Sequence, residues 1–149
     1  MAPMVEMPRR EVPPPLELVK SRIEELLPPD ALREIDAEAV TVIDTRPPEE
    51  FELGRIAGAV NVPAGENGVD SHSPDFARRV TEAAGGRPAV LYCNSGNRSA
   101  RAADALTNEH GVEGSRSIIG GIKLWSDLGF PIEGSLPAPE EDDKEDGEG

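Results

Sequence analysis

Short runs of apolar, often β-branched residues alternate with helix-like segments along most of this chain, and this alternation constrains the fold more than any other feature. The strand-like runs are 40–43, 59–62, 89–92 and 117–119. Helices are predicted over 28–35, 75–84, 99–110 and 122–128, with a brief helical turn at 49–53 and a helical first half in 16–27. Such alternation predicts a parallel sheet covered on both faces, with a ligand site beyond the carboxyl ends of its strands.

The predicted domain spans residues 16–135, and the segments on either side of it differ in composition. Residues 1–15 are rich in proline and carry few large apolar side chains, so we expect a flexible arm there. Residues 136–149 are acidic, and we expect a disordered tail. A chain of 149 residues suits one domain and leaves little room for a second.

Charge and cysteine content narrow the classes of partner and compartment. The formal net charge of −14 argues against binding to nucleic acid or to an anionic membrane, and a small anionic ligand would need a local positive site. Cys93 is the only cysteine, so the chain does not resemble a disulfide-stabilised secreted domain. Because neither an apolar run of about 20 residues nor the apolar region of a signal peptide is present, we expect a cytoplasmic protein.

The segment from Cys93 to Ser99 carries the chemical signal. Cys93 follows a predicted strand, Gly96 lies inside the loop, and Arg98 and Ser99 lie where the next helix starts. Glycine permits a tight loop whose amides point inward and form an anion-binding concavity, to which the helix dipole adds. A thiol in that position should ionise easily, so we predict a nucleophile near neutral pH. Arg98 would add a fixed charge or a bidentate contact to an anionic substrate.

Each loop residue also has a structural interpretation. A lone cysteine at a strand end is most often a small buried hydrophobe, but the glycine, arginine and helix start that follow favour a reactive one. Ser95 and Ser99 are candidate hydrogen-bond donors to a bound sulfur, although Ser99 also suits an N-cap or the first turn. Asn94 and Asn97 complete the loop. Taken alone, this loop suits nucleophilic attack on phosphorus, arsenic or sulfur.

Four motifs in order resemble the rhodanese homology family, over about residues 18–134. They lie at 42–46, 54–63, 93–99 and 120–131. The resemblance implies a single-domain rhodanese-like α/β fold, with a five-stranded parallel sheet flanked by helices on both faces. It also implies a persulfide intermediate on Cys93, bound by the loop Asn94, Ser95, Gly96, Asn97, Arg98 and Ser99. Arg55 stands where the family usually has histidine, so the contacts of that histidine do not carry over.

The length of the loop bears on the reaction. Family members with sulfurtransferase activity usually have the shorter spacing seen between Cys93 and Arg98, whereas related phosphatases and arsenate reductases have one more residue. The resemblance thus implies transfer of a sulfane sulfur from a small anionic donor such as thiosulfate to cyanide or a thiol. Two alternatives are a sulfur-carrier or regulatory module without thiosulfate activity, with a sulfur-relay protein partner, and a phosphatase- or arsenate reductase-like enzyme.

Other polar residues are assigned mainly structural roles. Asp44 and Arg46 either support the pocket or form a structural pair, and the second interpretation is favoured. His72 and His110 are not clustered with other ligand-type residues, so neither a metal nor another cofactor is expected. The Gly120–Gly121 pair is predicted to allow close packing or a turn before the last helix.

Overall fold

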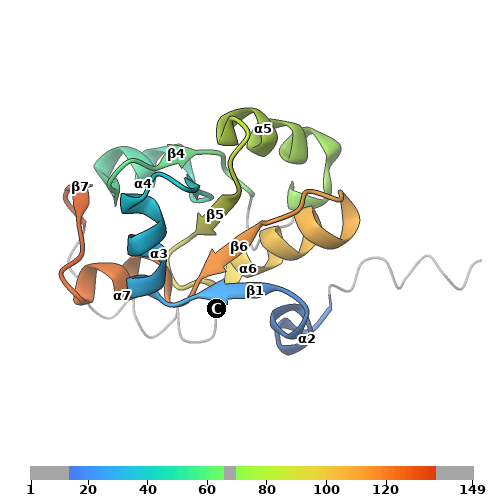
Figure 1. Ribbon diagram of the computed structural model, residues 1–149, viewed down its shortest axis with the longest axis horizontal. Helices are drawn as coiled ribbons and strands as arrows, with labels where there is room; N and C mark the ends of the chain where they lie inside the picture. The colour runs from blue at the N-terminus through green and yellow to red at the C-terminus, as the bar shows by residue number, and fades with distance from the viewer. Residues whose placement is uncertain (1–13, 66–69, 137–149) are drawn as a thin grey trace, which may run out of the picture.

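The computed structural model describes residues 14–65 and 70–136, and its centre is a five-stranded parallel sheet (Figure 1). The strand order is β1-β6-β5-β2-β4. These strands are β1 (Glu24–Leu26), β2 (Thr41–Asp44), β4 (Val60–Asn61), β5 (Ala89–Tyr92) and β6 (Arg116–Ile118). A separate antiparallel pair joins β3 (Gly54–Ile56) to β7 (Ile132–Gly134). The predicted α/β fold with a five-stranded parallel sheet is confirmed.

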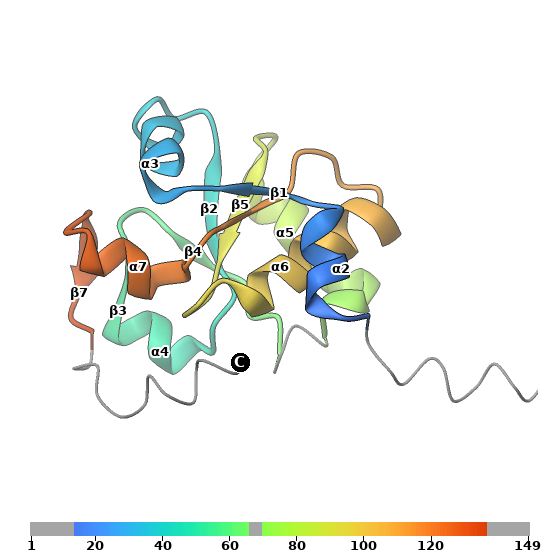
Figure 2. The same ribbon diagram turned by 90° about the horizontal axis from the view of Figure 1, so that it is seen from below.

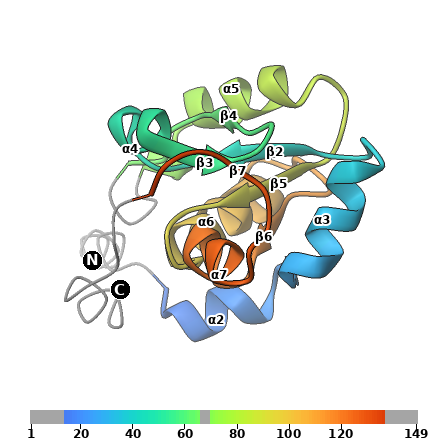
Figure 3. The same cartoon turned by 90° about the vertical axis from the view of Figure 1, so that its left-hand side faces the viewer.

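Helices cover both faces of the sheet (Figure 2). One face carries α5 (Pro74–Ala84) and α6 (Asn97–Asp104), and α6 continues into a π-helical turn, η3 (Ala105–Glu109). The other face carries α3 (Pro28–Asp36) and α7 (Gly121–Asp127). Two short helices, α2 (Leu16–Ser21) and α4 (Pro48–Leu53), pack against α6 and β3 respectively. Figure 3 shows α5 and α2 at opposite ends of the molecule.

Strand β5 lies in the middle of the sheet and is buried along its whole length. Its side chains alternate between the two cores, as the two-residue period of a strand requires. Ala89 and Leu91 pack in the core under α5 and α6. Val90 and Tyr92 pack in the core under α3 and α7, where Trp125 is also fully buried. The strand that precedes Cys93 is therefore packed on both of its faces.

Two parts of the architecture were not predicted as strands. Strand β1 has the sequence Glu-Glu-Leu, which lacks a β-branched run, and its pairing with β6 makes it a strand. The β3–β7 pair depends on close backbone approach, because a Cβ on Gly134 would lie 2.3 Å from the Leu53 carbonyl oxygen. Both features come from contacts between segments that lie far apart in the sequence.

The flexible arm and the acidic tail predicted for the two ends fall almost wholly on residues 1–13 and 137–149, outside the described part of the chain. Within that part, the carbonyl oxygen of Pro14 accepts a hydrogen bond of 2.8 Å from Arg101. No helix of residues 14–65 and 70–136 has both the length and the apolar character needed to cross a membrane.

Candidate functional site

Cys93 begins the loop between β5 and α6, at the carboxyl edge of the central strand. In an open parallel sheet this edge is where ligands bind. Strand β2 lies directly beside β5 and β4 lies beside β2, so the loops that follow these three strands meet at one edge. The sequence pattern had placed the predicted nucleophile at this edge.

Two backbone amides face the sulfur of Cys93. The amide of Gly96 lies 3.2 Å from Sγ and that of Ser99 lies 3.4 Å from it. Gly96 has φ +97°, a conformation that favours glycine and turns the loop back over the sulfur. Cys93 is a free cysteine with 3% of its surface exposed. Inward-facing amides of this kind stabilise an anion on the sulfur atom.

The first turn of α7 supports the same loop. Ile122 donates a backbone hydrogen bond of 2.9 Å to the carbonyl oxygen of Cys93, and Lys123 donates one of 3.1 Å to that of Asn94. Gly121 has φ +61°, and a Cβ there would lie 2.3 Å from the Asn94 oxygen and 2.5 Å from the Cys93 oxygen. The Gly120–Gly121 pair therefore does allow close packing, and the segment that Gly121 packs against is the loop from Cys93 to Ser99.

The side chains of the loop residues point to several partners. The Ser99 hydroxyl lies 2.8 Å from the hydroxyl of Ser117 on β6, and both serines are fully buried. Ser99 is the third residue of α6, whose N-cap is Gly96, so of the two structural interpretations the structure places Ser99 in the first turn and not at the N-cap. Asn94 donates to Glu50 of α4 across 3.5 Å. Ser95 and Asn97 are half-buried.

Arg98 follows in the first turn of α6, and its half-buried side chain lines a hollow of about 220 Å³. The rest of the lining comes from the loops after β2 and β4: Pro47, Pro48, Pro63 and Gly65. The Arg98 Nε is buried and has no hydrogen-bond partner within the described residues. Sequence analysis had found Arg98 but not the prolines, which come together only in the folded chain.

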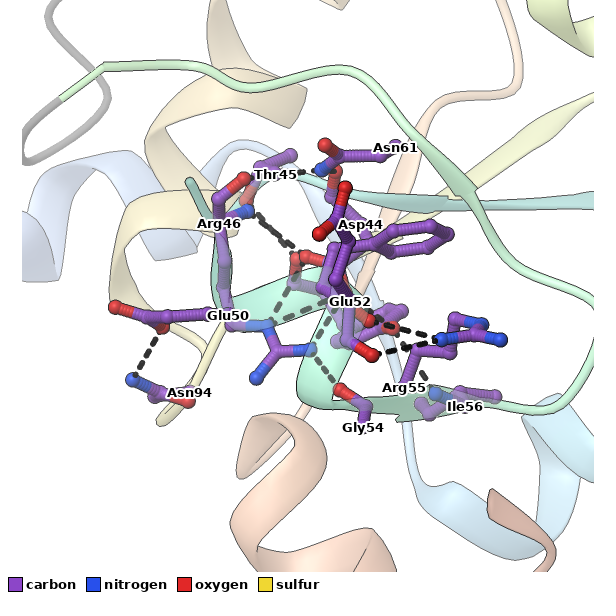
Figure 4. A network of polar contacts seen from close by, with 12 residues as sticks. Asp44, Thr45, Arg46, Glu50, Glu52, Gly54, Arg55, Ile56, Asn61 and Asn94 are labelled. Carbon is purple, nitrogen blue, oxygen red and sulfur yellow. Dashed lines mark hydrogen bonds and ion pairs between the residues drawn. The ribbon is translucent and has the colours of Figure 1, made fainter. Parts of the chain in front are cut away.

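Asp44 and Arg46 belong to a buried network of polar contacts near this edge of the sheet (Figure 4). Their exposed fractions are 0% and 3%, and Arg46 Nη2 lies 2.8 Å from Asp44 Oδ2. The same guanidinium nitrogen donates to the Gly54 carbonyl oxygen at 2.6 Å. The Tyr92 hydroxyl donates to Asp44 Oδ2 at 2.6 Å and accepts from the Ile56 amide at 3.0 Å. The network joins β2, β5 and β3, and this geometry favours the structural interpretation of the pair.

The electrostatics of the network reinforce its geometry. Burial acts to lower the pKa of Arg46, but the hydrogen bonds and negative charge of Asp44 outweigh burial and raise it overall. Burial, together with the charge and hydrogen bond of Asp44, raises the pKa of Tyr92 well above its ordinary range. The phenol therefore stays protonated and remains a hydrogen-bond donor. Asn61 adds two bonds of 3.0 Å to the carbonyl oxygens of Asp44 and Arg46.

Arg55 and the two histidines lie in separate contacts. The Arg55 guanidinium stacks 5.0 Å from the Phe51 ring centroid and pairs with Glu133 at 3.3 Å, so it links α4 and β3 to β7. His72 pairs with Glu109 at 2.8 Å, and His110 lies 3.1 Å from the Ser71 carbonyl oxygen. Residues 14–65 and 70–136 contain no cluster of three or more His, Cys, Asp or Glu side chains that could hold a metal ion.

Comparison with protein families matches residues 27–128 to the rhodanese-like domain. The adenylyltransferase and sulfurtransferase MOCS3-1 of Drosophila pseudoobscura pseudoobscura is 35% identical over 94 residues, which are 61% of this chain and 20% of that protein. Thiosulfate sulfurtransferase 16, chloroplastic, of Arabidopsis thaliana is 37% identical over 92 residues, 60% of this chain and 76% of that protein. The chain thus spans about a fifth of the MOCS3 relative and most of the plant relative.

Solved structures show the same architecture. A Rhodopseudomonas palustris protein of unknown function, described as a possible tyrosine phosphatase, has TM-score 0.64 and 32% identity, covering 79% of this chain and 90% of that chain. A thiosulfate sulfurtransferase from Pseudomonas aeruginosa has TM-score 0.66 and 22% identity, covering 87% of this chain and 25% of that chain. At that identity the second match bears on the fold alone.

Proposed function

Because the chain belongs to the rhodanese-like domain family, we propose that it is a sulfurtransferase that carries a sulfane sulfur as a persulfide on Cys93. The observation that carries this proposal is the pair of amides, from Gly96 and Ser99, at 3.2 and 3.4 Å from Sγ. Relatives named as sulfurtransferases support the reaction class. The positions of Cys93, Gly96 and Arg98 fit a loop that stabilises an anionic sulfur.

In the first half-reaction the Cys93 thiolate attacks the outer sulfur of a donor such as thiosulfate. A new S–S bond forms to Cys93, the S–S bond of the donor breaks, and sulfite leaves with the electron pair. The amides of Gly96 and Ser99 stabilise negative charge on the cysteine sulfur before attack and in the persulfide that results. Arg98 attracts the anionic donor in a chain whose formal net charge is −14.

In the second half-reaction a thiophilic acceptor removes the outer sulfur. Cyanide gives thiocyanate, and a thiolate gives a persulfide of the acceptor; in both cases Cys93 leaves as a thiolate. The chain has a single cysteine, so no second thiol of this chain can resolve the persulfide. An external acceptor is therefore required, and ping-pong kinetics are expected.

The test is formation of thiocyanate from thiosulfate and cyanide. We expect parallel lines in a double-reciprocal plot of rate against thiosulfate at several cyanide concentrations. Cys93→Ser should remove the activity. No thiocyanate above the uncatalysed rate from the folded wild-type protein would overturn the proposed activity with thiosulfate.

Hydrolysis of a phosphate ester is a second candidate, because the Rhodopseudomonas palustris relative is described as a possible tyrosine phosphatase. The spacing opposes it, since only four residues separate Cys93 from Arg98. An aryl phosphate assay decides between the two reactions. Cys93-dependent release of the phenol, with no thiocyanate formation, would favour the hydrolase.

A sulfur-carrier or regulatory module is a third candidate, with a partner protein in place of thiosulfate. The MOCS3 relative supports this alternative, because the match covers only 20% of a protein whose name joins a sulfurtransferase to an adenylyltransferase. In that protein the matching part is thus one portion of a larger chain. A carrier would accept sulfur from a protein persulfide donor and pass it on, while thiosulfate left Cys93 unchanged. Loading Cys93 from a persulfidated cysteine desulfurase, but not from thiosulfate, would favour the carrier.

A further inference from the structure

The contact between α6 and β6 includes a pair of buried hydroxyl groups. The hydroxyl oxygens of Ser99 on α6 and Ser117 on β6 lie 2.8 Å apart, and both residues have 0% of their surface exposed. Ser117 is in register with Leu91 of the neighbouring strand β5, whose side chain packs in the core under α5 and α6. A buried hydroxyl costs free energy unless it is hydrogen-bonded, so this pair ties the helix to the sheet.

Ser99 connects the hydroxyl pair to the sulfur of Cys93. Its backbone amide lies 3.4 Å from Sγ, slightly further than the Gly96 amide at 3.2 Å. Helix α6 begins at Asn97, and its N-cap, Gly96, has no side chain that could accept from the amides of the first turn. These amides are therefore left for another acceptor, and the residue whose amide faces the sulfur is also bonded to β6 through its hydroxyl.

The segment that begins at Ser117 supports other parts of the same loop. A Cβ on Gly96 would lie 3.1 Å from the Ile118 carbonyl oxygen, so the loop passes close to the end of β6. Ile122 donates a hydrogen bond of 2.9 Å to the carbonyl oxygen of Cys93. The contacts of Ile118 and Ile122 are made by the backbone, whereas the contact of Ser117 is made by a side chain. It can therefore be removed by substitution.

We propose that Ser117 is a positioning residue for the nucleophile, and that its hydroxyl holds Ser99 so that the Ser99 amide faces Cys93 Sγ. This inference rests on the proposed function, in which Cys93 reacts as a thiolate. Hydrogen bonds to the charged form of a group favour that form. Without the Ser117 hydroxyl, the first turn of α6 loses a contact with the sheet, the amide–sulfur contact lengthens, and the thiolate is less favoured.

The test is the pH dependence of the reaction of Cys93 with hydroxyethyl disulfide, a neutral probe, with the mixed disulfide measured by intact mass. In Ser117→Ala the midpoint of the pH profile should rise by about one unit, because a charge-assisted hydrogen bond to sulfur is weakened. A more basic thiolate is also more nucleophilic, with a Brønsted coefficient of roughly 0.4–0.5. The variant should thus react about threefold more slowly well below the midpoint and about threefold faster well above it. A change in access to the sulfur alone would shift the rate in one direction at every pH.

Ser115→Ala is the matched control. Ser115 is buried just before β6, and its hydroxyl donates to the Val112 carbonyl oxygen at 3.3 Å, so its removal should leave the pH profile unchanged. Ser99→Ala, alone and combined with Ser117→Ala, tests the route. If Ser117 acts through the Ser99 hydroxyl, the double variant should have the same midpoint as either single variant. The double variant also removes both buried hydroxyls, so it should be at least as stable as Ser117→Ala.

Two results would overturn the inference. One is a wild-type midpoint in Ser117→Ala, or in the double variant if the single variant does not fold. The other is a midpoint in the double variant well above that of Ser99→Ala, because Ser117 would then act on the sulfur without Ser99. The probe carries no sulfane sulfur, so a shifted midpoint supports the inference even if thiosulfate does not load Cys93. Loading from thiosulfate with unshifted midpoints would leave the proposed function intact and exclude this role of Ser117.

Discussion

Arg46 and Arg98 each follow the carboxyl end of one of two neighbouring strands, yet their surroundings are opposite. Arg46 is 3% exposed, lies 2.8 Å from the Asp44 carboxylate and also binds the Gly54 carbonyl oxygen. Arg98 is half-buried, lines a hollow and keeps an Nε without a partner among the described residues. We infer from this difference that one arginine is committed to the fold, while the other is left available for a ligand.

The largest predicted effect is on stability at the committed arginine. Arg46→Ala leaves the fully buried Asp44 carboxylate without its charge partner, so the free energy of unfolding should fall by about 3–5 kcal/mol. Arg98→Ala should change it by less than about 1 kcal/mol. Urea denaturation followed by circular dichroism measures both. Equal losses would contradict the division between the two arginines.

The second prediction concerns the turn that supports the loop. Gly121→Ala should lower kcat/KM for thiosulfate about 100-fold, because its Cβ would displace the carbonyl groups of Cys93 and Asn94. Gly85→Ala is the matched control, since Gly85 has the same φ of +61° with nothing within 4 Å of the added atom. Similar losses of activity in the two variants would mean that backbone strain alone, and not loop position, is responsible.

A third, smaller effect is expected at the available arginine. Arg98→Lys keeps the charge but loses the planar, bidentate donor set, so kcat/KM for thiosulfate should fall by about tenfold. Removal of the cyanide-reactive sulfur from preloaded Cys93 should change less, because that step needs no anionic oxygen group. Single-turnover kinetics separate the two half-reactions. An equal fall in both would assign Arg98 to the loop structure.

The smallest predicted effect involves the partly exposed pair of Arg22 and Asp104, which adds a third arginine to the comparison. Burial acts against ionisation of Asp104, but hydrogen bonds from Arg22 and Asn108 outweigh it and lower the pKa of Asp104. A lowered folded-state pKa contributes stability above the unfolded value of about 3.9, and that stability is lost as pH falls through the folded value. In urea unfolding between about pH 5 and 3, the free energy of unfolding should therefore fall less in Arg22→Gln than in the wild type. An identical pH dependence of the unfolding free energy in the two proteins would contradict this prediction.

Local patterns were sufficient to predict the strand that leads to Cys93. Residues 89–92 are uniformly apolar and Cys93 follows at once, so both the buried strand and the loop at its carboxyl end could be inferred. Gly96 indicated a tight loop, and the structure places two amides toward the sulfur. Each of these features depends on residues that lie only a few positions apart in the sequence.

Features that depend on distant segments could not be predicted in this way. Nothing local marks Tyr92 as the hydroxyl partner of Asp44, or Ser117 as the partner of Ser99. The helix predicted over 99–110 begins instead at Asn97 and becomes π-helical at Ala105. The hollow beside Arg98 requires three separate loops to meet, so its proline lining follows from the sheet order.

The most direct test of the central claim follows a labelled sulfur atom from the donor to the protein. The wild-type protein is incubated with thiosulfate that carries a heavy sulfur isotope only at the outer position, and the Cys93 peptide is analysed by mass spectrometry. One labelled sulfur should be found on Cys93 and be removed by cyanide, whereas Cys93→Ser should gain none. A peptide that stays unmodified, or one that gains the inner sulfur with its oxygens, would contradict the account.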